Sequence, residues 1–370
     1  MSSRRSFLMQ ATASGVVATT NTLQITDASG QVTQASASRT TGYNIPRTDL
    51  AVSRLGYGCA SLVDWDRQPL SADRLTKAES LVKTAYDNGI TFFDLADNYA
   101  FHNAEIAFGK ILRRSPDLRR RIVIQSKCGI VNGDENQVGG TFRVDLSGEH
   151  IVRAVEGSLD RLGVDHLDIL LLHWPDILIK PQEVASAFDD LHRSGKVRYF
   201  GVSNHTASQI EFLQRDVRQP LITNQIHLSL EHSRLIAGGL AQIWNQIPIQ
   251  GIQDYTQLSS TIDYCRKQSI QLQAYSPLRG VLLDPSRESS AELQQAARLL
   301  ADMATKQASN ASAIALAWLM HHPASIIPII GSTQPDHIIE NCAADRVTLT
   351  NYEWYTLLIS NLKSYGQAGT

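Results

Sequence analysis

The stretch Ile90-Thr91-Phe92-Phe93-Asp94-Leu95-Ala96-Asp97-Asn98-Tyr99 decides the fold. Its apolar first half follows a turn signal, Asn88-Gly89, and predicts a short buried strand. The strand ends on Asp94, and Tyr99 follows five residues later in the loop. A carboxylate where a buried strand opens into a loop, with a phenol close by, can form an acid–base pair. Burial raises the pKa of a phenol, so a nearby cation is needed to lower it.

Two later strand-like runs end on residues that complete such a set. The run 122–127 ends on Lys127, and the run 167–173 ends on His173. A lone Tyr, Lys or His at a strand end is more often structural than catalytic. Four chemically compatible residues at equivalent places in successive β-α units favour a catalytic site, because barrel enzymes build their active sites at the C-terminal ends of the strands.

Strand-like and helix-like segments alternate along the rest of the chain. This pattern predicts an α/β protein, a single-domain (β/α)8 TIM barrel over residues 47–363. A doubly wound sheet is the alternative, but Gly56 and Gly58 lack the third glycine of a GxGxxG turn. The predicted strands are 55–60, 90–94, 122–127, 167–173, 197–203, 221–225, 270–275 and 326–330. The predicted helices are 71–88, 104–114, 148–162, 182–194, 207–215, 256–268, 291–306, 311–321, 335–342 and 351–362.

Two connections are unusually long. The polar, Gly-rich loop 129–145 is long enough to be a lid. The segment 226–255 is an excursion rich in aliphatic and aromatic residues. It can be a locally packed loop, a cover over a pocket or a surface for a partner, and the first is the commonest case.

Composition excludes several classes of protein. The 370 residues carry a net charge of -2 and are 43% hydrophobic, which suits one large α/β domain or two ordinary ones and argues against a nucleic-acid binder. No apolar run reaches the roughly 18 residues of a membrane span. The four cysteines lie far apart without metal-ligand spacing, so free buried thiols and no metal are expected, with disulfide pairing as the alternative for an exported protein. They are Cys59, Cys128, Cys265 and Cys342.

The N-terminus predicts an export signal. Ser3-Arg4-Arg5-Ser6-Phe7-Leu8 resembles the twin-arginine motif, and Ala35-Ser36-Ala37 offers a small-residue cleavage site. We therefore expect a signal peptide over residues 1–37, a linker over 38–46 and the twin-arginine export machinery as a partner. The protein is then periplasmic or otherwise exported. If the segment is only a disordered tail, the protein is cytoplasmic.

The order Asp94, Tyr99, Lys127, His173 resembles the aldo-keto reductases, in their bacterial oxidoreductase branch, over about residues 47–345. The resemblance implies a (β/α)8 barrel that transfers hydride between a nicotinamide dinucleotide and a small aldehyde, ketone or alcohol, and we expect a monomer. The other matching motifs are Ser126-Lys127, Leu172-His173-Trp174-Pro175, Ser194-Gly195-Lys196-Val197-Arg198, Gly201-Val202-Ser203-Asn204, Asn224-Gln225, Ala274-Tyr275-Ser276-Pro277-Leu278 and Gly331-Ser332-Thr333.

The resemblance also implies the role of each catalytic residue. Tyr99 is the general acid that protonates the carbonyl oxygen. Lys127, paired with Asp94, lowers the pKa of the phenol and brings proton donation nearer neutral pH. His173 orients the carbonyl. Trp174, Trp65 and Phe101 are candidates for an apolar substrate pocket.

The resemblance further implies a dinucleotide site. The residues it assigns to the nicotinamide are Ser203, Asn204, Gln225 and Tyr275, and those along the pyrophosphate and adenosine are Ser276, Leu278, Gly331, Ser332, Thr333 and Asn341. The family often has an Arg where this chain has His337. We expect NADP as the cofactor, with NAD as the alternative. Because the Arg that would bind the 2′-phosphate of NADP is absent, we expect weak discrimination between the two.

A second class of function stays open. Some barrels of this type act as nucleotide-binding sensors or subunits with little turnover. The intact set of Asp94, Tyr99, Lys127 and His173 favours the enzyme.

Overall fold

The computed structural model describes residues 42–133, 143–238, 256–279 and 291–364. All of them belong to the second of two units of the chain, Ala37–Thr370. The predicted signal peptide therefore lies outside the described residues.

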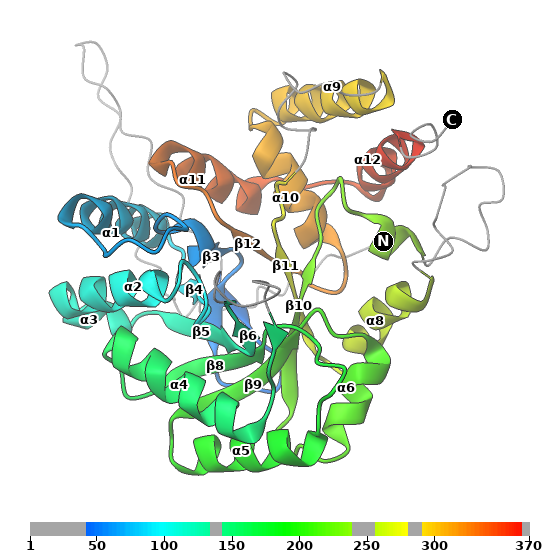
Figure 1. Ribbon diagram of the computed structural model, residues 1–370. Coiled ribbons are helices and arrows are strands. Elements are labelled where there is room, and N and C mark those ends of the chain that lie inside the picture. Colours follow the sequence, from blue (N-terminus) through cyan, green and yellow to red (C-terminus); the bar gives the residue numbers. More distant parts are fainter. Residues whose placement is uncertain (1–41, 134–142, 239–255, 280–290, 365–370) are drawn as a thin grey trace, which may run out of the picture. The chain divides into compact units, whose positions relative to one another are not determined.

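Eight parallel strands close into a barrel, as the sequence predicts (Figure 1). The last strand pairs with the first, since Ile329 lies opposite Gly56, so this sheet has no exposed edge. The strands are β3 (Gly56–Gly58), β4 (Phe92–Asp94), β5 (Val123–Cys128), β8 (Leu167–Leu172), β9 (Val197–Ser203), β10 (Leu221–His227), β11 (Gln271–Tyr275) and β12 (Ile327–Ile330).

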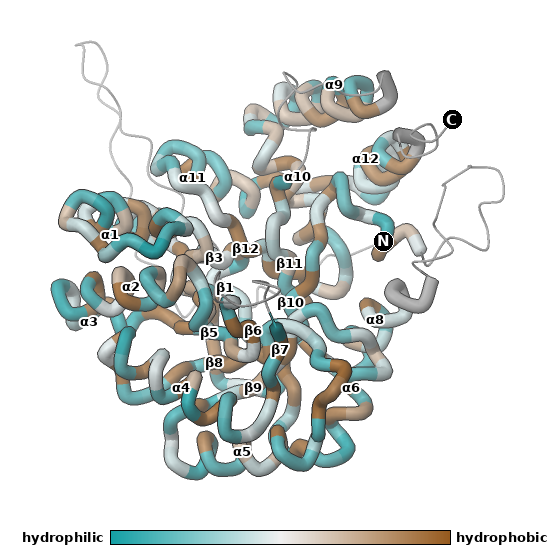
Figure 2. Tube along the Cα trace, in the orientation of Figure 1, coloured by the Kyte–Doolittle hydropathy of each residue, from teal (hydrophilic) through white to brown (hydrophobic). Residues whose placement is uncertain are grey.

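Helices follow the strands on the outside, and hydrophilic and hydrophobic residues alternate along most of them (Figure 2). In α1, Leu75, Leu81 and Val82 are buried, and the Ser71 hydroxyl accepts a hydrogen bond from the backbone N–H of Arg74 as the N-cap. The helices are α1 (Ala72–Asp87), α2 (Asn103–Arg114), α3 (Pro116–Arg119), α4 (Gly148–Leu162), α5 (Pro181–Arg193), α6 (Ala207–Gln214), α7 (Arg234–Ala237), α8 (Thr256–Lys267), α9 (Ala291–Lys306), α10 (Ala311–His321), α11 (Pro335–Cys342) and α12 (Asn351–Ser364).

A small hairpin packs at the N-terminal ends of the strands. Its strands are β1 (Gly42–Asn44) and β2 (Ala51–Ser53), which pair antiparallel. Ile45, between them, is buried in one apolar cluster with barrel residues such as Phe92 and Ile222. The described part of the predicted linker, residues 42–46, therefore packs against the barrel through the buried side chain of Ile45.

The two long connections are only partly described. The loop 129–145 begins and ends as a short antiparallel hairpin of β6 (Ile130–Val131) and β7 (Arg143–Val144). Residues 134–142, where a lid would lie, are outside the described residues. In the second connection β10 continues to His227 and α7 follows, while residues 239–255 are outside the described residues.

The structure bears on the cysteines, on membrane-spanning helices and on groups of possible metal ligands. All four cysteines are buried and free. Within the described ranges, no helix is long and apolar enough to cross a membrane. Within the same ranges, no group of three or more His, Cys, Asp or Glu side chains is placed to hold a metal ion.

Candidate active site

The four predicted catalytic side chains meet at the C-terminal ends of β4, β5 and β8. Lys127 lies at their centre, fully buried, and its Nζ donates to Asp94 Oδ2 at 2.7 Å and to the Tyr99 hydroxyl at 3.1 Å. A third hydrogen bond from Nζ goes to the Leu95 carbonyl at 2.9 Å. The three donors of the ammonium group are thus all used, and its position is fixed.

Burial and the neighbouring groups together determine the protonation states of Tyr99 and Lys127. Burial raises the pKa of Tyr99, and the charge of Lys127 offsets only part of that rise, so the pKa of the phenol stays above its ordinary value. The expectation of a lowered pKa is therefore corrected: Lys127 acts in the predicted direction, but burial outweighs it. Burial alone would lower the pKa of Lys127, yet Asp94 and Tyr99 raise it overall. Near neutral pH, Tyr99 holds its proton and Lys127 is charged.

His173 is a neutral imidazole. Burial, and secondly the charge of Lys127, hold its pKa well below the ordinary value. Its ring lies edge-on to Tyr99, with the ring centres 5.7 Å apart. Its Nδ1 has no hydrogen-bond partner among the described residues. A neutral imidazole beside the phenol can donate a hydrogen bond to a carbonyl oxygen but is a poor proton donor.

Three buried glutamines form a hydrogen-bonded group beneath Asp94 inside the barrel, and two of them donate to its carboxylate. Gln125 Nε2 donates to Asp94 Oδ1 at 2.6 Å, and Gln225 Nε2 donates to the same oxygen at 3.0 Å. Both amides also donate to Gln273 Oε1, at 2.8 and 2.9 Å. The structure thus places the Gln225 amide behind Asp94. The sequence signal for the trio is weak, because each glutamine shares its strand with other polar residues.

The remaining residues predicted at the nicotinamide form one cluster. The Tyr275 hydroxyl donates to Asn204 Oδ1 at 3.1 Å, and Asn204 Nδ2 donates to Ser203 Oγ at 2.9 Å. Asn204 has φ 62°, a left-handed conformation that Asn tolerates better than most residues. His227 stacks on Tyr275 with the ring centres 5.1 Å apart. This cluster fixes Tyr275 at the mouth of the barrel.

A cavity of about 630 Å³ opens from the catalytic residues. It is lined by Asp94 and Tyr99 and, on the opposite strands, by residues that the sequence assigns to the dinucleotide. These are Tyr275, Ser276, Leu278, Gly331, Ser332, His337 and Asn341. Thr333, Ser203, Asn204 and Gln225 are not part of this lining. The cavity reaches His337 in the first turn of α11, and the N-terminal end of a helix favours an anionic group such as a phosphate.

Arg279 is a lining residue that the sequence reasoning missed. It follows Ser276-Pro277-Leu278 directly, and its backbone N–H donates to the Ser276 carbonyl at 3.1 Å. Its charge partly offsets the rise that burial causes in the pKa of Tyr275. A cation beside an aromatic ring, in a cavity that ends at a helix N-terminus, fits the phosphates of a dinucleotide.

The three aromatic candidates for the substrate pocket surround Tyr99 and His173. Trp65 lies with its ring centre 6.0 Å from Tyr99 and 6.1 Å from Phe101, and Trp174 lies 6.3 Å from His173. Ala100, Phe101 and His102 all have positive φ, at 47°, 54° and 73°. Each such residue costs roughly 1–3 kcal/mol, so the surrounding contacts must hold this left-handed turn in place.

Asp97 is a buried carboxylic acid beside the catalytic loop. Burial, and then the charge of Glu105, raise its pKa to about 7, although Arg161 acts in the opposite direction. Between about pH 4 and 7 the folded protein therefore binds a proton here that the unfolded chain does not. Stability is greatest at the acidic end of this range and falls as the pH rises through it.

Asp97→Asn should therefore stabilise the protein at pH 8, by about 2–4 kcal/mol, and change little at pH 4. The measurement is urea unfolding at both pH values, with Asp160→Asn, an exposed carboxylate on α4, as the control. Equal effects of Asp97→Asn at pH 4 and pH 8 would show that Asp97 does not change its protonation state between them and would contradict the raised pKa.

Comparison with known proteins agrees with this geometry. Residues 54–359 match the model of the aldo/keto reductase family. The chain is 34% identical over 312 residues to the oxidoreductase YdhF of Escherichia coli (strain K12), an alignment that covers 82% of this chain and 92% of that protein. It is 32% identical over 317 residues to a 6-dehydroglucose reductase of Novosphingobium aromaticivorans, covering 84% of this chain and 92% of that protein.

The fold has solved counterparts. A glycerol dehydrogenase of Gluconobacter oxydans superposes with a TM-score of 0.72 at 21% identity, covering 89% of this chain and 97% of that chain. The family match extends over the whole barrel and includes the four residues that meet at Lys127. The chain therefore belongs to the aldo/keto reductase family and is an NAD(P)-dependent oxidoreductase.

Proposed function

We propose that the protein reduces an aldehyde or ketone, or oxidises the corresponding alcohol, with Tyr99 as the proton donor. The observation that carries the proposal is the buried Lys127 ammonium, hydrogen-bonded to both Asp94 and the Tyr99 hydroxyl. The nicotinamide dinucleotide supplies or accepts the hydride when bound. Tyr99 gives its proton to the carbonyl oxygen, and Lys127 stabilises the phenolate left behind. Asp94 holds Lys127 in place, and His173 donates a hydrogen bond that orients the carbonyl.

The test is consumption of NADPH and NADH by the purified protein with a panel of simple and hydroxylated aldehydes. Reduction of at least one carbonyl, lost in Tyr99→Phe, is expected. The alternative is a sensor or subunit barrel, which would bind the dinucleotide tightly without turnover on any member of the panel. The intact contacts of Lys127 favour the enzyme.

We propose a hydroxylated carbonyl compound as the substrate. A relative is named for reduction of an oxidised sugar. Near Tyr99, the Trp65 and Phe101 rings offer flat apolar surfaces for the carbon face of a sugar, and polar groups for its hydroxyls lie at the neighbouring Asp97 and Asn98.

NADP, with NAD as the alternative, is the proposed cofactor. Positive charge from Arg279 and a hydrogen-bond donor from His337 support it, whereas Glu340, which lines the same cavity, opposes a 2′-phosphate. We propose that these effects nearly cancel, so discrimination between NADP and NAD is weak.

His337→Arg should raise the affinity for NADP over NAD by about tenfold or more, because one charged hydrogen bond contributes roughly 1.5–3 kcal/mol. Tryptophan quenching by each cofactor measures this ratio. His321→Arg adds the same charge on α10, away from the cavity, and should leave the ratio unchanged. An unaltered ratio in His337→Arg would place the 2′-phosphate elsewhere.

We also propose export through the twin-arginine machinery, from Arg4-Arg5 and Ala35-Ser36-Ala37, and hence a periplasmic or otherwise exported protein. That the protein is a monomer is a separate proposal. Arg4→Lys combined with Arg5→Lys should retain the full-length protein in the cytoplasm of a host that has this machinery. Cell fractionation measures this outcome. Unchanged fractionation of the double variant would refute the export signal.

A further inference from the structure

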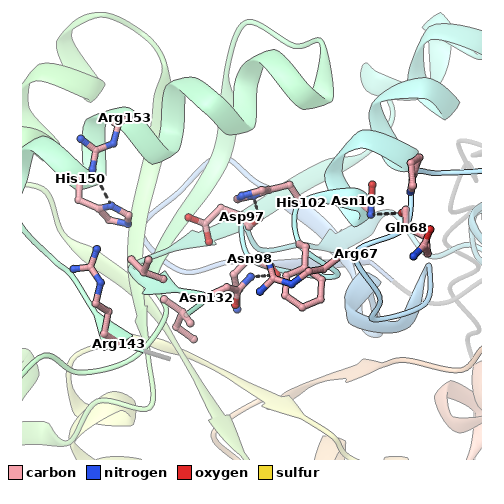
Figure 3. A pocket seen from close by; sticks show the side chains of 14 residues that line it. Arg67, Gln68, Asp97, Asn98, His102, Asn103, Asn132, Arg143, His150 and Arg153 are labelled. Atoms are coloured by element: carbon pink, nitrogen blue, oxygen red, sulfur yellow. Dashed lines mark hydrogen bonds between the residues drawn. The ribbon is translucent and has the colours of Figure 1, made fainter. Parts of the chain in front are cut away.

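A second cavity, of about 640 Å³, lies beside the catalytic loop. It is formed by residues after β3, by the loop 97–103, by the β6–β7 hairpin and by the first turns of α4 (Figure 3). None of its lining residues lines the dinucleotide cavity. The loop that carries Tyr99 contributes to both cavities: Tyr99 lines the dinucleotide cavity, and Asp97, Asn98 and Phe101 line the second.

Positive charge is concentrated in this cavity. Arg67, Arg143 and Arg153 line it, and so does His150, whose pKa burial lowers, so that it is a neutral donor near neutral pH. Figure 3 shows Arg143, His150 and Arg153 on one side of the cavity, facing Asp97. Arg153 binds Glu149 at 2.9 Å and Arg143 lies 3.6 Å from Asp145, so each guanidinium uses only part of its donors in these pairs. The Nε2 atom of His150 is buried and has no partner among the described residues.

Unpaired acceptors line the same cavity. The Oδ1 atoms of Asp97, Asn98 and Asn132 are buried without a hydrogen-bond partner in the described part of the chain. Asp97 and Asn98 are each only 5% exposed. Buried acceptors are normally satisfied, and a ligand with several hydroxyl groups would supply the missing donors.

An apolar wall completes the site. Arg67 lies over the Phe101 ring, 4.5 Å from its centre, and Ile130 and Val131 add carbon surface. Phe101 also contacts Trp65, which contacts Tyr99. Through these rings the cavity adjoins the side of Tyr99 where the substrate is proposed to bind.

We propose that this cavity binds the anionic end of a hydroxylated carbonyl substrate, a sugar carrying a carboxylate or a phosphate. Arg67, Arg143, Arg153 and His150 would hold the anion, and Asp97, Asn98 and Asn132 would accept from its hydroxyls. The inference rests on the proposed carbonyl reduction and specifies its substrate class. A neutral polyol would leave the cationic donors unused, and a simple anion would leave the three acceptors unused.

The first test is binding without turnover. D-gluconate, 6-phospho-D-gluconate and D-sorbitol are titrated calorimetrically into the full chain without added dinucleotide. Both anions should bind at least about tenfold more tightly than sorbitol, as one charged hydrogen bond predicts. Arg143→Gln and Arg153→Gln should each weaken anion binding by about 3- to 10-fold. Arg193→Gln, an equally exposed arginine with a similar ion pair on α5, is the control.

Equal binding of the anions and sorbitol would overturn the proposal, and so would anion binding that ignores both arginine variants. Because both arginines are well exposed, the variants should fold. Far-ultraviolet circular dichroism confirms this before titration.

The second test asks whether the anion belongs to the substrate. The ratio of kcat/KM for D-glucuronate to that for D-glucose should fall by about 3- to 10-fold in Arg143→Gln and Arg153→Gln but not in Arg193→Gln. An unchanged ratio, with gluconate not competing against glucuronate, would mean that a separate small anion binds here and would overturn the substrate assignment. Absence of turnover on every carbonyl would instead defeat the proposed reduction, while the binding test would still decide whether the anion site exists.

Discussion

Tyr99→Phe should reduce turnover by about 10²-fold or more and leave dinucleotide binding nearly intact, because general acid catalysis contributes at least that factor. Among the described residues, Tyr99 alone lies within hydrogen-bond distance of Lys127 Nζ, lines the cavity and has a proton to give, and the substitution removes this hydroxyl. The ring itself remains, so its edge contacts with Trp65 and His173 are kept. The loss should therefore appear in kcat and kcat/KM together.

Tyr352→Phe provides the matched control, since Tyr352 lies on α12 and is 81% exposed. Turnover and cofactor affinity are measured for both variants at several pH values. Near-normal turnover in Tyr99→Phe would remove Tyr99 from the mechanism. His173, whose pKa is held well below its ordinary value, is too weakly protonated near neutral pH to replace it.

Lys127→Met should lower the free energy of unfolding by about 3–5 kcal/mol, because it leaves the buried carboxylate of Asp94 without its cation. The side chain of Asp94 is only 3% exposed, so water cannot replace the ammonium without local opening. Turnover should fall as well, since the phenolate of Tyr99 would lose its stabilising charge.

Adding Asp94→Asn to Lys127→Met separates these two effects. The Asn side chain keeps an oxygen that can accept from Gln125 and Gln225, and it removes the unpaired charge. The double variant should recover most of the lost stability in urea unfolding but none of the lost turnover. Recovery of turnover together with stability would mean that Lys127 is only a structural residue.

Sequence periodicity predicted the barrel because its elements are long or strongly patterned. The predicted helices over 148–162 and 335–342 agree to the residue with α4 and α11, and the run ending at Lys127 differs by one residue from β5. Strands β1 and β6, of three and two residues, have neither an alternating pattern nor a longer apolar run around them like the one that predicts β4. They depend on contacts with distant parts of the chain, such as the burial of Ile45 against Phe92.

The candidate site was predictable where residue order carried the information. Asp94, Tyr99, Lys127 and His173 stand at strand ends, and parallel strands bring such ends together. The hydrogen bonds of Gln125, Gln225 and Gln273 depend on which barrel residues face inward at the same level, and this cannot be read from one strand at a time. The net pKa of Tyr99 also required the structure, because burial and the charge of Lys127 act in opposite directions.

The glutamine trio also determines the route by which Tyr99 recovers its proton after a turnover. Carboxamides neither release nor take up protons near neutral pH, so Gln125, Gln225 and Gln273 cannot conduct one through the barrel interior. Lys127 Nζ donates its three hydrogen bonds to Asp94, Leu95 and Tyr99. Among the described residues, the carboxylate of Asp94 accepts hydrogen bonds only from Lys127, Gln125 and Gln225. The replacement proton must therefore enter from the open face of the barrel, by the same side as the substrate.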